Sequence, residues 1–431
     1  MNMRIAVVGA GVSGMMAAWF LQDEHEVTLF DREPFLGGHA HTFPVSLGAQ
    51  TVYAETGARF FFDVSFPYLL ALLRLLDVPL RWCPTHISFV DRPHRHTVVL
   101  PPRSPRHVLS LLRSARMLRH VLQLRRLAES ADQVVRDRDW SMTLSEYLRH
   151  NHYSPSFGPE FIFPFISASW GAPLAEIPQF PIYSLLSVMR RSPGREAGTY
   201  EIDGGISVYT ETLGKRLTRT ALRLGTGIRR IREESGFVLE DEQGQAMRFD
   251  RLVLATSARD AARLLADVPA AAGLHTVARS FRHFETEIVI HGDPSFMPAQ
   301  RHNWSMINLF NEGDHTWMTD WSGWRDQLPV FRTWMPPQRP APTPLYCRRA
   351  FHHLIMNPEN RTLQKRMAEL QGRDGIWLIG MYSIETDSHE SALKSALVPA
   401  RELSPQSPAM KLLLEQVHRN QSSPDRAERS G

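Results

Sequence analysis

The glycines of the segment "GAGVSG", residues 9–14, have the spacing that binds the phosphates of a dinucleotide. The first glycine allows a tight turn, the second lets backbone approach a pyrophosphate without a Cβ in the way, and the third lets a helix pack close to a strand. The apolar residues 5–8 predict a buried strand before the turn, and residues 15–21 predict the helix after it. A second strand ends at Asp31, where a carboxylate can accept hydrogen bonds from ribose hydroxyls. We therefore expect a nucleotide site containing Gly9, Gly11, Val12, Ser13, Gly14, Asp31 and Arg32.

The composition bounds the class of protein. A chain of 431 residues favours two domains, and 43% hydrophobic with 22% charged residues is typical of a globular protein. The net charge of +4 is a small excess that does not indicate nucleic-acid binding. Two distant cysteines, Cys83 and Cys347, favour a reducing compartment, and no apolar run reaches 18 residues. We expect a cytoplasmic protein without a signal peptide that acts on a small-molecule substrate.

A second glycine pair, Gly37 and Gly38, follows Asp31 and is not needed by an NAD site. Together with the first turn, it resembles the start of the flavin-containing amine oxidase superfamily, which includes monoamine oxidases, phytoene desaturases and bacterial fatty-acid isomerases. The segments "LGGHAHT" and "HESALKSAL" are most similar to a bacterial branch of FAD-dependent, amine-oxidase-like proteins. The resemblance implies that FAD is bound and that its pyrophosphate passes Gly37, Gly38 and His39. We expect non-covalent binding, because neither cysteine lies in the C-terminal flavin segment.

Further segments extend this resemblance to residues 54–61, 200–217, 225–244, 249–258 and 375–404. It implies flavin contacts at Gly57, Ala58, Arg59, Phe60 and Gly380, and a contact of Ile228 on the adenine side of FAD. It also implies that the backbone N–H groups of Ala392 and Leu393 face flavin O2. The implied fold is α/β, with a Rossmann-like FAD-binding domain (1–80, 200–275 and 372–404) interleaved with an α+β substrate domain of mixed antiparallel sheet plus helices (81–199 and 276–371). Residues 405–431 would form a partly disordered tail with one short helical pattern.

Because a flavin supplies the redox chemistry, the protein's task is to position the substrate and to tune the ring. The sequence names no catalytic residue; the pocket candidates are Tyr382, Trp170, Trp317 and Trp321. His39 and His41 have the spacing of a metal pair but lack an evident third ligand, so we expect no metal.

Two departures from the family bear on the reaction. Residues 387–392 differ from the usual family segment. Many amine oxidases also have a lysine in the substrate domain that holds a water at flavin N5, but none of the four lysines here lies between Lys215 and Lys365. The favoured reaction is therefore hydride transfer from a C–H bond of an apolar, acyl-type molecule, as in a desaturase or isomerase. An amine or amino-acid oxidase that makes hydrogen peroxide, and a non-catalytic flavoprotein subunit, stay open as alternatives.

Residues 103–129 have the pattern of a basic amphipathic helix. Leu111, Ala115, Leu118 and Leu122 would share the apolar face, and arginines would occupy the other. Such a helix is either a solvated outer face or a contact with an anionic partner, such as membrane lipid, an acyl carrier or a carboxylate substrate.

Overall fold

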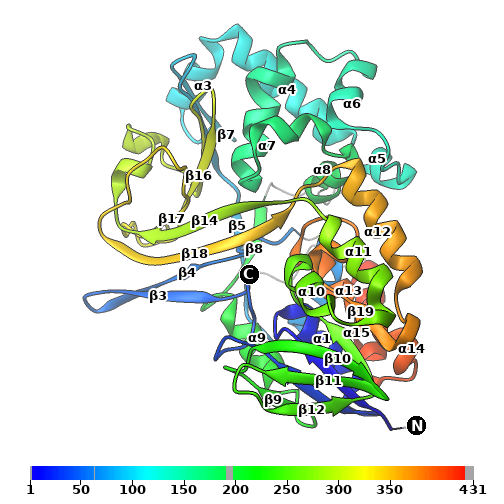
Figure 1. Ribbon diagram of the computed structural model, residues 1–431. Helices are drawn as coiled ribbons and strands as arrows, with labels where there is room; N and C mark the ends of the chain where they lie inside the picture. Colours follow the sequence, from blue (N-terminus) through cyan, green and yellow to red (C-terminus); the bar gives the residue numbers. More distant parts are fainter. Residues whose placement is uncertain (1, 63, 191–197, 423–431) are drawn as a thin grey trace.

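The computed structural model describes residues 2–62, 64–190 and 198–422, and it contains two large β-sheets (Figure 1). The first is a five-stranded parallel sheet in the order β19-β13-β1-β2-β9. Its strands are β1 (Arg4–Val8), β2 (Glu26–Phe30), β9 (Ala221–Arg223), β13 (Arg251–Leu254) and β19 (Ile376–Leu378). This is the strand order of a Rossmann-type sheet, so the predicted α/β fold is confirmed.

Alternate residues of β1 enter two different apolar cores. Ile5 and Val7 pack against α1 (Val12–Leu21). All residues of α1 are buried, and a helix that is buried on every side needs apolar residues around its whole circumference. Ala6 and Val8 face the other way, toward α10 (Ala258–Leu265) and α11 (Ala272–Ser280). The three-stranded antiparallel sheet β10 (Ile228–Glu234), β11 (Gly236–Asp241) and β12 (Ala246–Phe249) belongs to this second core. Helices thus lie on both sides of a central parallel strand.

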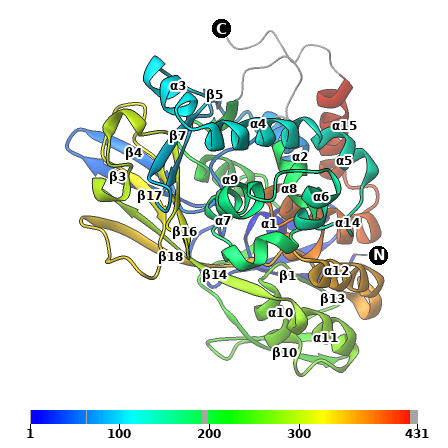
Figure 2. The same cartoon turned by 90° about the horizontal axis from the view of Figure 1, so that it is seen from above.

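The second large sheet has seven strands and a mixed pattern. Its order is β18 (Leu345–Leu354), β14 (His283–His291), β17 (Phe331–Trp334), β16 (Thr316–Trp321), β15 (Ile307–Asn311), β6 (Ile87–Asp91) and β7 (His96–Leu100). Only the β15–β6 pair is parallel. Several helices lie to one side of this sheet (Figure 2), namely α5 (Ala131–Asp137), α6 (Leu144–His150), α7 (Phe163–Trp170) and α8 (Ile182–Met189). The bounds of the two interleaved domains stay a prediction.

Shorter elements connect these units. The small two-stranded sheets are β3 (Thr42–Leu47) with β4 (Gln50–Glu55), and β5 (Leu80–Pro84) with β8 (Gly198–Ile202). The remaining helices on the nucleotide side are α2 (Pro67–Leu75), α9 (Ser207–Gly214), α12 (Pro358–Leu370), α13 (His389–Ser395) and α14 (Leu397–Leu403). No helix within the described residues is both long and apolar enough to cross a membrane.

The C-terminal region contains the helix that its sequence pattern predicts. Residues 408–422 form α15 (Pro408–Ser422), which packs against α2 and buries Leu413 completely. Its apolar residues complete the core beside α1. Residues 423–431 lie outside the described residues.

The single basic helix predicted for residues 103–129 is wrong. The segment forms α3 (Pro105–Leu112) and α4 (Ala115–Glu129), because the Ser114 hydroxyl accepts a hydrogen bond from the Met117 N–H and starts a new helix. The break also changes the buried face. In α4 the buried residues are Met117, His120 and Leu127, whereas Leu122 is 57% exposed.

A buried ion network joins the loop after β4 to the seven-stranded sheet. The Asp320 carboxylate has no exposed surface and accepts hydrogen bonds from Arg332 Nε (2.5 Å) and Arg59 Nη1 (2.7 Å). Arg59 also binds Glu201 of β8 at 2.8 Å, and Arg332 donates to the carbonyl oxygen of Gly57. Each buried charge is thus paired with an opposite charge from another element, which is the condition for burying it.

We predict that Asp320→Asn destabilises the protein by about 3–5 kcal/mol, because two buried guanidinium groups lose their shared counter-charge. Urea unfolding followed by circular dichroism measures the change. Asp314→Asn is the matched control, since the Asp314 side chain is 83% exposed, and we expect less than about 0.5 kcal/mol there. Equal unfolding midpoints for the two variants would contradict the role given to Asp320.

Candidate functional site

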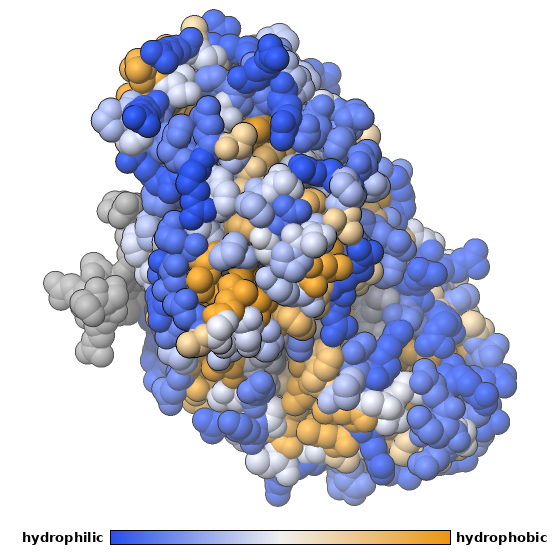
Figure 3. Space-filling view, turned by 90° about the vertical axis from the view of Figure 1, so that its left-hand side faces the viewer, coloured by the Kyte–Doolittle hydropathy of each residue, from blue (hydrophilic) through white to orange (hydrophobic). Residues whose placement is uncertain are grey.

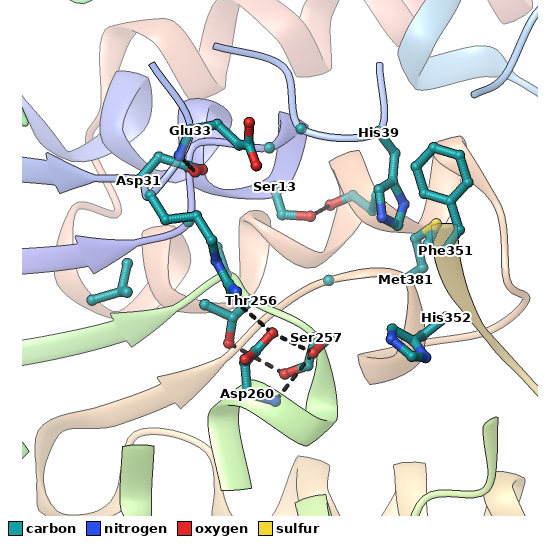
Figure 4. Close-up of a pocket in the computed structure, with 18 of the residues that line it drawn as sticks. Ser13, Asp31, Glu33, His39, Thr256, Ser257, Asp260, Phe351, His352 and Met381 are labelled. Atoms are coloured by element: carbon teal, nitrogen blue, oxygen red, sulfur yellow. Dashed lines mark hydrogen bonds and ion pairs between the residues drawn. The ribbon is translucent and has the colours of Figure 1, made fainter. Parts of the chain in front are cut away.

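A cavity of about 860 Å³ opens at the carboxyl ends of the parallel strands (Figure 4). In a doubly wound sheet this edge is where cofactors bind. The segments after β1, β2, β13 and β19 all contribute to its wall, together with residues 349–352 of β18. Twelve of the predicted cofactor residues line it: Gly9, Gly11, Val12, Ser13, Asp31, Arg32, Gly37, Gly38, His39, Ile228, Gly380 and Ala392.

The three glycines of the first turn have different surroundings. Gly9 has φ +105°, and a Cβ there would lie 2.5 Å from the Ala255 carbonyl oxygen. A Cβ on Gly14 would lie 1.8 Å from the Gly9 carbonyl oxygen, so this glycine lets α1 approach the turn. A Cβ on Gly11 would meet no atom within 4 Å and would project into open space. The turn therefore leaves room at the position where a pyrophosphate would approach the backbone.

The second glycine pair lies against the first turn. Gly37 N–H donates to the Ala10 carbonyl oxygen at 2.9 Å, and Gly38 approaches the Cα of Gly11. Both have positive φ, +109° and +58°. The chain can make this close approach only without side chains at these positions.

Polar groups gather at the end of the cavity near β2. Asp31 accepts hydrogen bonds from the N–H groups of Ala10 (2.6 Å) and Glu33 (2.8 Å), and burial raises its pKa. Arg32 forms an ion pair with Asp260 at 3.0 Å. One lone pair on each Asp31 oxygen is already used, which fixes the carboxylate and leaves further acceptor capacity for ribose hydroxyls.

The opposite end of the cavity contains aromatic and imidazole rings. His39 packs edge-on against Phe351, and Met381, Tyr382 and His389 also line this end. Burial lowers the pKa values of His39 and His389 to about 4, so both imidazoles are neutral at pH 7. The His389 ring lies 2.6 Å from the Tyr209 hydroxyl. Tyr382 lies where it was predicted, and its hydroxyl is buried without a partner among the described residues.

The donors predicted on α13 lie within the helix. The Ala392 N–H donates to the Ser388 carbonyl oxygen at 3.0 Å, and the Ala392 carbonyl oxygen accepts from the Ser13 hydroxyl at 2.8 Å. Leu393 is fully buried in the core beside α1 and does not line the cavity. The helix begins at His389, as the sequence predicts, and Ala392 is its fourth residue, so the Ala392 N–H bonds within the helix. Contact of the Ala392 and Leu393 N–H groups with flavin O2 stays a prediction.

The segment 57–60 does not line this cavity. A Cβ on Gly57 would lie 2.1 Å from the His39 carbonyl oxygen, so Gly57 lies directly against the backbone of His39. Arg59 belongs to the buried ion network, and its guanidinium also lies over the Phe60 ring. Gly14, Gly57, Ala58, Arg59, Phe60 and Leu393 are the predicted cofactor residues that do not line the cavity.

The three tryptophans predicted as pocket candidates do not line this cavity either. Trp317 stacks on Phe310 with ring centroids 3.7 Å apart, and Trp321 packs edge-on against Trp304. Trp170 packs against the core of the helices beside the seven-stranded sheet. All three serve the packing of that half of the protein.

One pair of functional groups was not found from the sequence. His353 Nδ1 lies 3.0 Å from Asp387 Oδ2, and Asp387 lines the cavity. Because a carboxylate only accepts hydrogen bonds, Nδ1 carries the hydrogen and Nε2 keeps its lone pair in the neutral ring. Nε2 and Asp387 Oδ1 are buried and have no partner within the described residues. The only sequence signal was the departure of residues 387–392 from the family pattern.

Comparison with known proteins decides the family. The sequence profile of the family described as "Flavin containing amine oxidoreductase" matches residues 12–291, more than half of the chain. The chain belongs to this family. It is thus an FAD-dependent oxidoreductase, and the open space at Gly11 and the paired glycines fit that cofactor.

Individual proteins resemble this chain either over a short segment or at low sequence identity. The "Probable zeta-carotene desaturase" of Synechococcus elongatus is 38% identical over 98 residues, which are 22% of this chain and 18% of that protein. Among solved structures, the CLA-producing fatty acid isomerase from P. acnes has a TM-score of 0.67 at 14% identity, covering 93% of this chain and 98% of the other. Cyclohexylamine oxidase from Brevibacterium oxydans has a TM-score of 0.61 at 15% identity, covering 96% and 99%. Likeness at such low identity shows the shared fold.

We predict that Gly11→Val abolishes FAD binding but leaves the apoprotein as stable as the wild type. The valine would fill the open space at the turn, and the φ of −67° at Gly11 is accessible to any residue. Gly14→Val is the contrasting variant: its side chain would collide with the Gly9 carbonyl, so it should unfold the nucleotide sheet. Flavin absorbance and thermal unfolding distinguish the two outcomes.

Acid denaturation of the wild type should release all the FAD, and flavin that stays with the polypeptide would contradict non-covalent binding.

A pH effect should arise at Glu390, whose carboxylate accepts hydrogen bonds from the Tyr68 and Leu69 N–H groups at the start of α2. Burial raises its pKa from 4.5 to about 7. Between these values the folded protein holds a proton that the unfolded chain has lost, so this carboxyl's contribution to stability falls as pH rises. Relative to Glu390→Gln, the wild-type free energy of unfolding should fall by on the order of 2–3 kcal/mol between pH 5 and 7. A pH-independent difference between the two proteins in urea unfolding would refute this.

Proposed function

We propose that this FAD-dependent oxidoreductase removes hydride from a C–H bond of an apolar, acyl-type small molecule, as a desaturase or an isomerase does. The observation that carries the proposal is the His353–Asp387 pair, of which Asp387 lines the cavity and His353 does not. Forming a C=C bond removes a hydride from one carbon and a proton from the next. The proton needs a base, and a neutral imidazole held by a carboxylate is a common one.

The pair has the arrangement that general-base catalysis requires. Asp387 comes from the loop before α13, and His353 comes from β18, so two separate elements fix the ring. The carboxylate holds Nδ1–H and would stabilise the imidazolium formed when Nε2 accepts a proton. His39, His283 and His352 are the other titratable groups near this pair.

Two of the neighbouring imidazoles are poor proton acceptors at pH 7. His39 has a pKa of about 4, and burial also lowers the pKa of His283. The Asp387 side chain, which holds His353, is only 2% exposed.

FAD supplies the two-electron acceptor when it is bound. The role that we assign to the chain is to bind the substrate, to exclude water and to accept the proton at His353 Nε2. The breaking C–H bonds then yield one hydride to the cofactor, one proton to the imidazole and one new C=C bond. In an isomerase, the hydride and the proton would both return to the substrate, so that an existing C=C bond changes position with no net oxidation.

The alternatives receive less support. Oxidation of an amine to an imine needs no base for a carbon-bound proton, and the sequence has no lysine between Lys215 and Lys365. The relatives described as carotene desaturase and fatty acid isomerase act, by their names, on apolar chains. A non-catalytic subunit would have no use for a buried His–Asp pair with a free nitrogen.

The proposal predicts that a long-chain fatty acid or its ester reduces the bound flavin under anaerobic conditions, or is isomerised without net reduction. Linoleate, methyl oleate and cyclohexylamine are suitable probes, followed by flavin absorbance and product mass spectrometry. His353→Gln should retain FAD but react about 10²–10⁴-fold more slowly, because the proton has no acceptor. Asp387→Asn should also retain FAD and react more slowly, because the His353 Nδ1–H loses the carboxylate that holds the ring.

His315→Gln is the matched control, because His315 pairs with Asp314 at 2.7 Å and neither residue lines this cavity. It should leave turnover unchanged. Rapid flavin reduction by cyclohexylamine with peroxide release would favour the amine oxidase instead. If none of the probes reduces the bound flavin or is isomerised, although dithionite still reduces the flavin, the non-catalytic alternative gains support.

A further inference from the structure

Exposed apolar side chains gather on α3 and α4. Within the described residues, nine large hydrophobic side chains are exposed, and four of them lie on these two adjacent helices: Val108 (45%), Leu109 (47%), Leu112 (60%) and Leu122 (57%). The two helices lie at the top of the molecule in Figure 1, and the upper end in Figure 3 shows hydrophobic side chains surrounded by hydrophilic ones. Isolated exposed leucines are ordinary, whereas a group on one short helix suggests a contact surface.

The exposed side of α3 is fixed by contacts on its other side. Leu111 enters the core beneath the helix, and the His107 ring contacts the His302 carbonyl oxygen at 3.1 Å. The Ser104 hydroxyl caps the helix by accepting from the His107 N–H. Because these contacts hold α3 in place, it cannot rotate to bury Leu109 and Leu112.

The charge around this apolar group has one sign. Residues 101–128 contain seven arginines and neither aspartate nor glutamate. Arg106, Arg113 and Arg119 are exposed and have no acidic partner among the described residues. Exposed leucines flanked by unpaired arginines are the two components of an interfacial helix that binds anionic lipid.

We propose that α3 and α4 form a docking surface for an anionic phospholipid bilayer. Val108, Leu109 and Leu112 would enter the interface between headgroups and acyl chains, and the arginines would bind lipid phosphates. A bilayer fits both features, whereas an acidic protein partner accounts for the arginines alone. This inference is independent of the reaction proposed above.

Co-sedimentation of the FAD-loaded protein with vesicles tests the surface. The wild type should bind phosphatidylcholine vesicles that contain phosphatidylglycerol, and both pure phosphatidylcholine and high salt should weaken binding. Leu109→Glu/Leu112→Glu should bind about tenfold or more weakly while retaining its FAD and its circular dichroism spectrum. Leu222→Glu on β9, also at an exposed leucine, is the matched control and should bind like the wild type.

Three results would overturn the proposal. The first is wild-type protein that stays in the supernatant with every vesicle. The second is equal binding by the wild type and the Leu109→Glu/Leu112→Glu variant. The third is a wild-type dimer that this double variant abolishes while vesicles have no effect, because the surface would then bind a second copy of the chain.

Discussion

Asp320 is a fully buried carboxylate whose charge must be neutralised inside the protein, and its two arginines come from separate parts of the chain. Arg332 belongs to the seven-stranded sheet, whereas Arg59 follows the β3–β4 hairpin. An isolated charge at this depth would cost far more than the folded state can tolerate, so these segments can only fold together. The position of Gly57 against His39 depends on the same contacts, since Arg332 also donates to its carbonyl oxygen. The ion network thus determines where Gly57 and the adjoining backbone of His39 lie relative to the seven-stranded sheet.

The nucleotide turn could be predicted because steric constraints act locally there. Gly9 needs a positive φ and Gly14 needs close helix packing, and both requirements are visible as glycines at fixed spacing. Asp31 follows from the same unit of strand, turn and helix. Such constraints can be recognised in a single sequence because they act between residues that are close together along the chain.

The errors arose where distant segments decide the role of a residue. Arg59 lies within the family-like segment 54–61, but its guanidinium binds Glu201 and Asp320, which are more than a hundred residues away in sequence. Trp317 and Trp321 could as well have faced a pocket, since alternation along a strand does not say which face is the core. The Ala392 N–H bonds to the Ser388 carbonyl oxygen, because Ala392 is the fourth residue of α13 and its N–H is not one of the free donors at the start of the helix. His353 and Asp387 are 34 residues apart in sequence and have no shared pattern.

The parallel sheet also determines when the protein can first hold its cofactor. β19 joins β13 at residues 376–378, and the wall of the cavity includes Gly380, Met381 and His389. The start of α2 is capped by Glu390, which is made more than three hundred residues later. A ribosome-bound chain therefore presents the glycine turn long before the remaining wall and this cap exist. Cofactor capture consequently requires synthesis of the chain through the last residues of this wall, and until then the early segments depend on chaperones or on their own solubility to stay unaggregated.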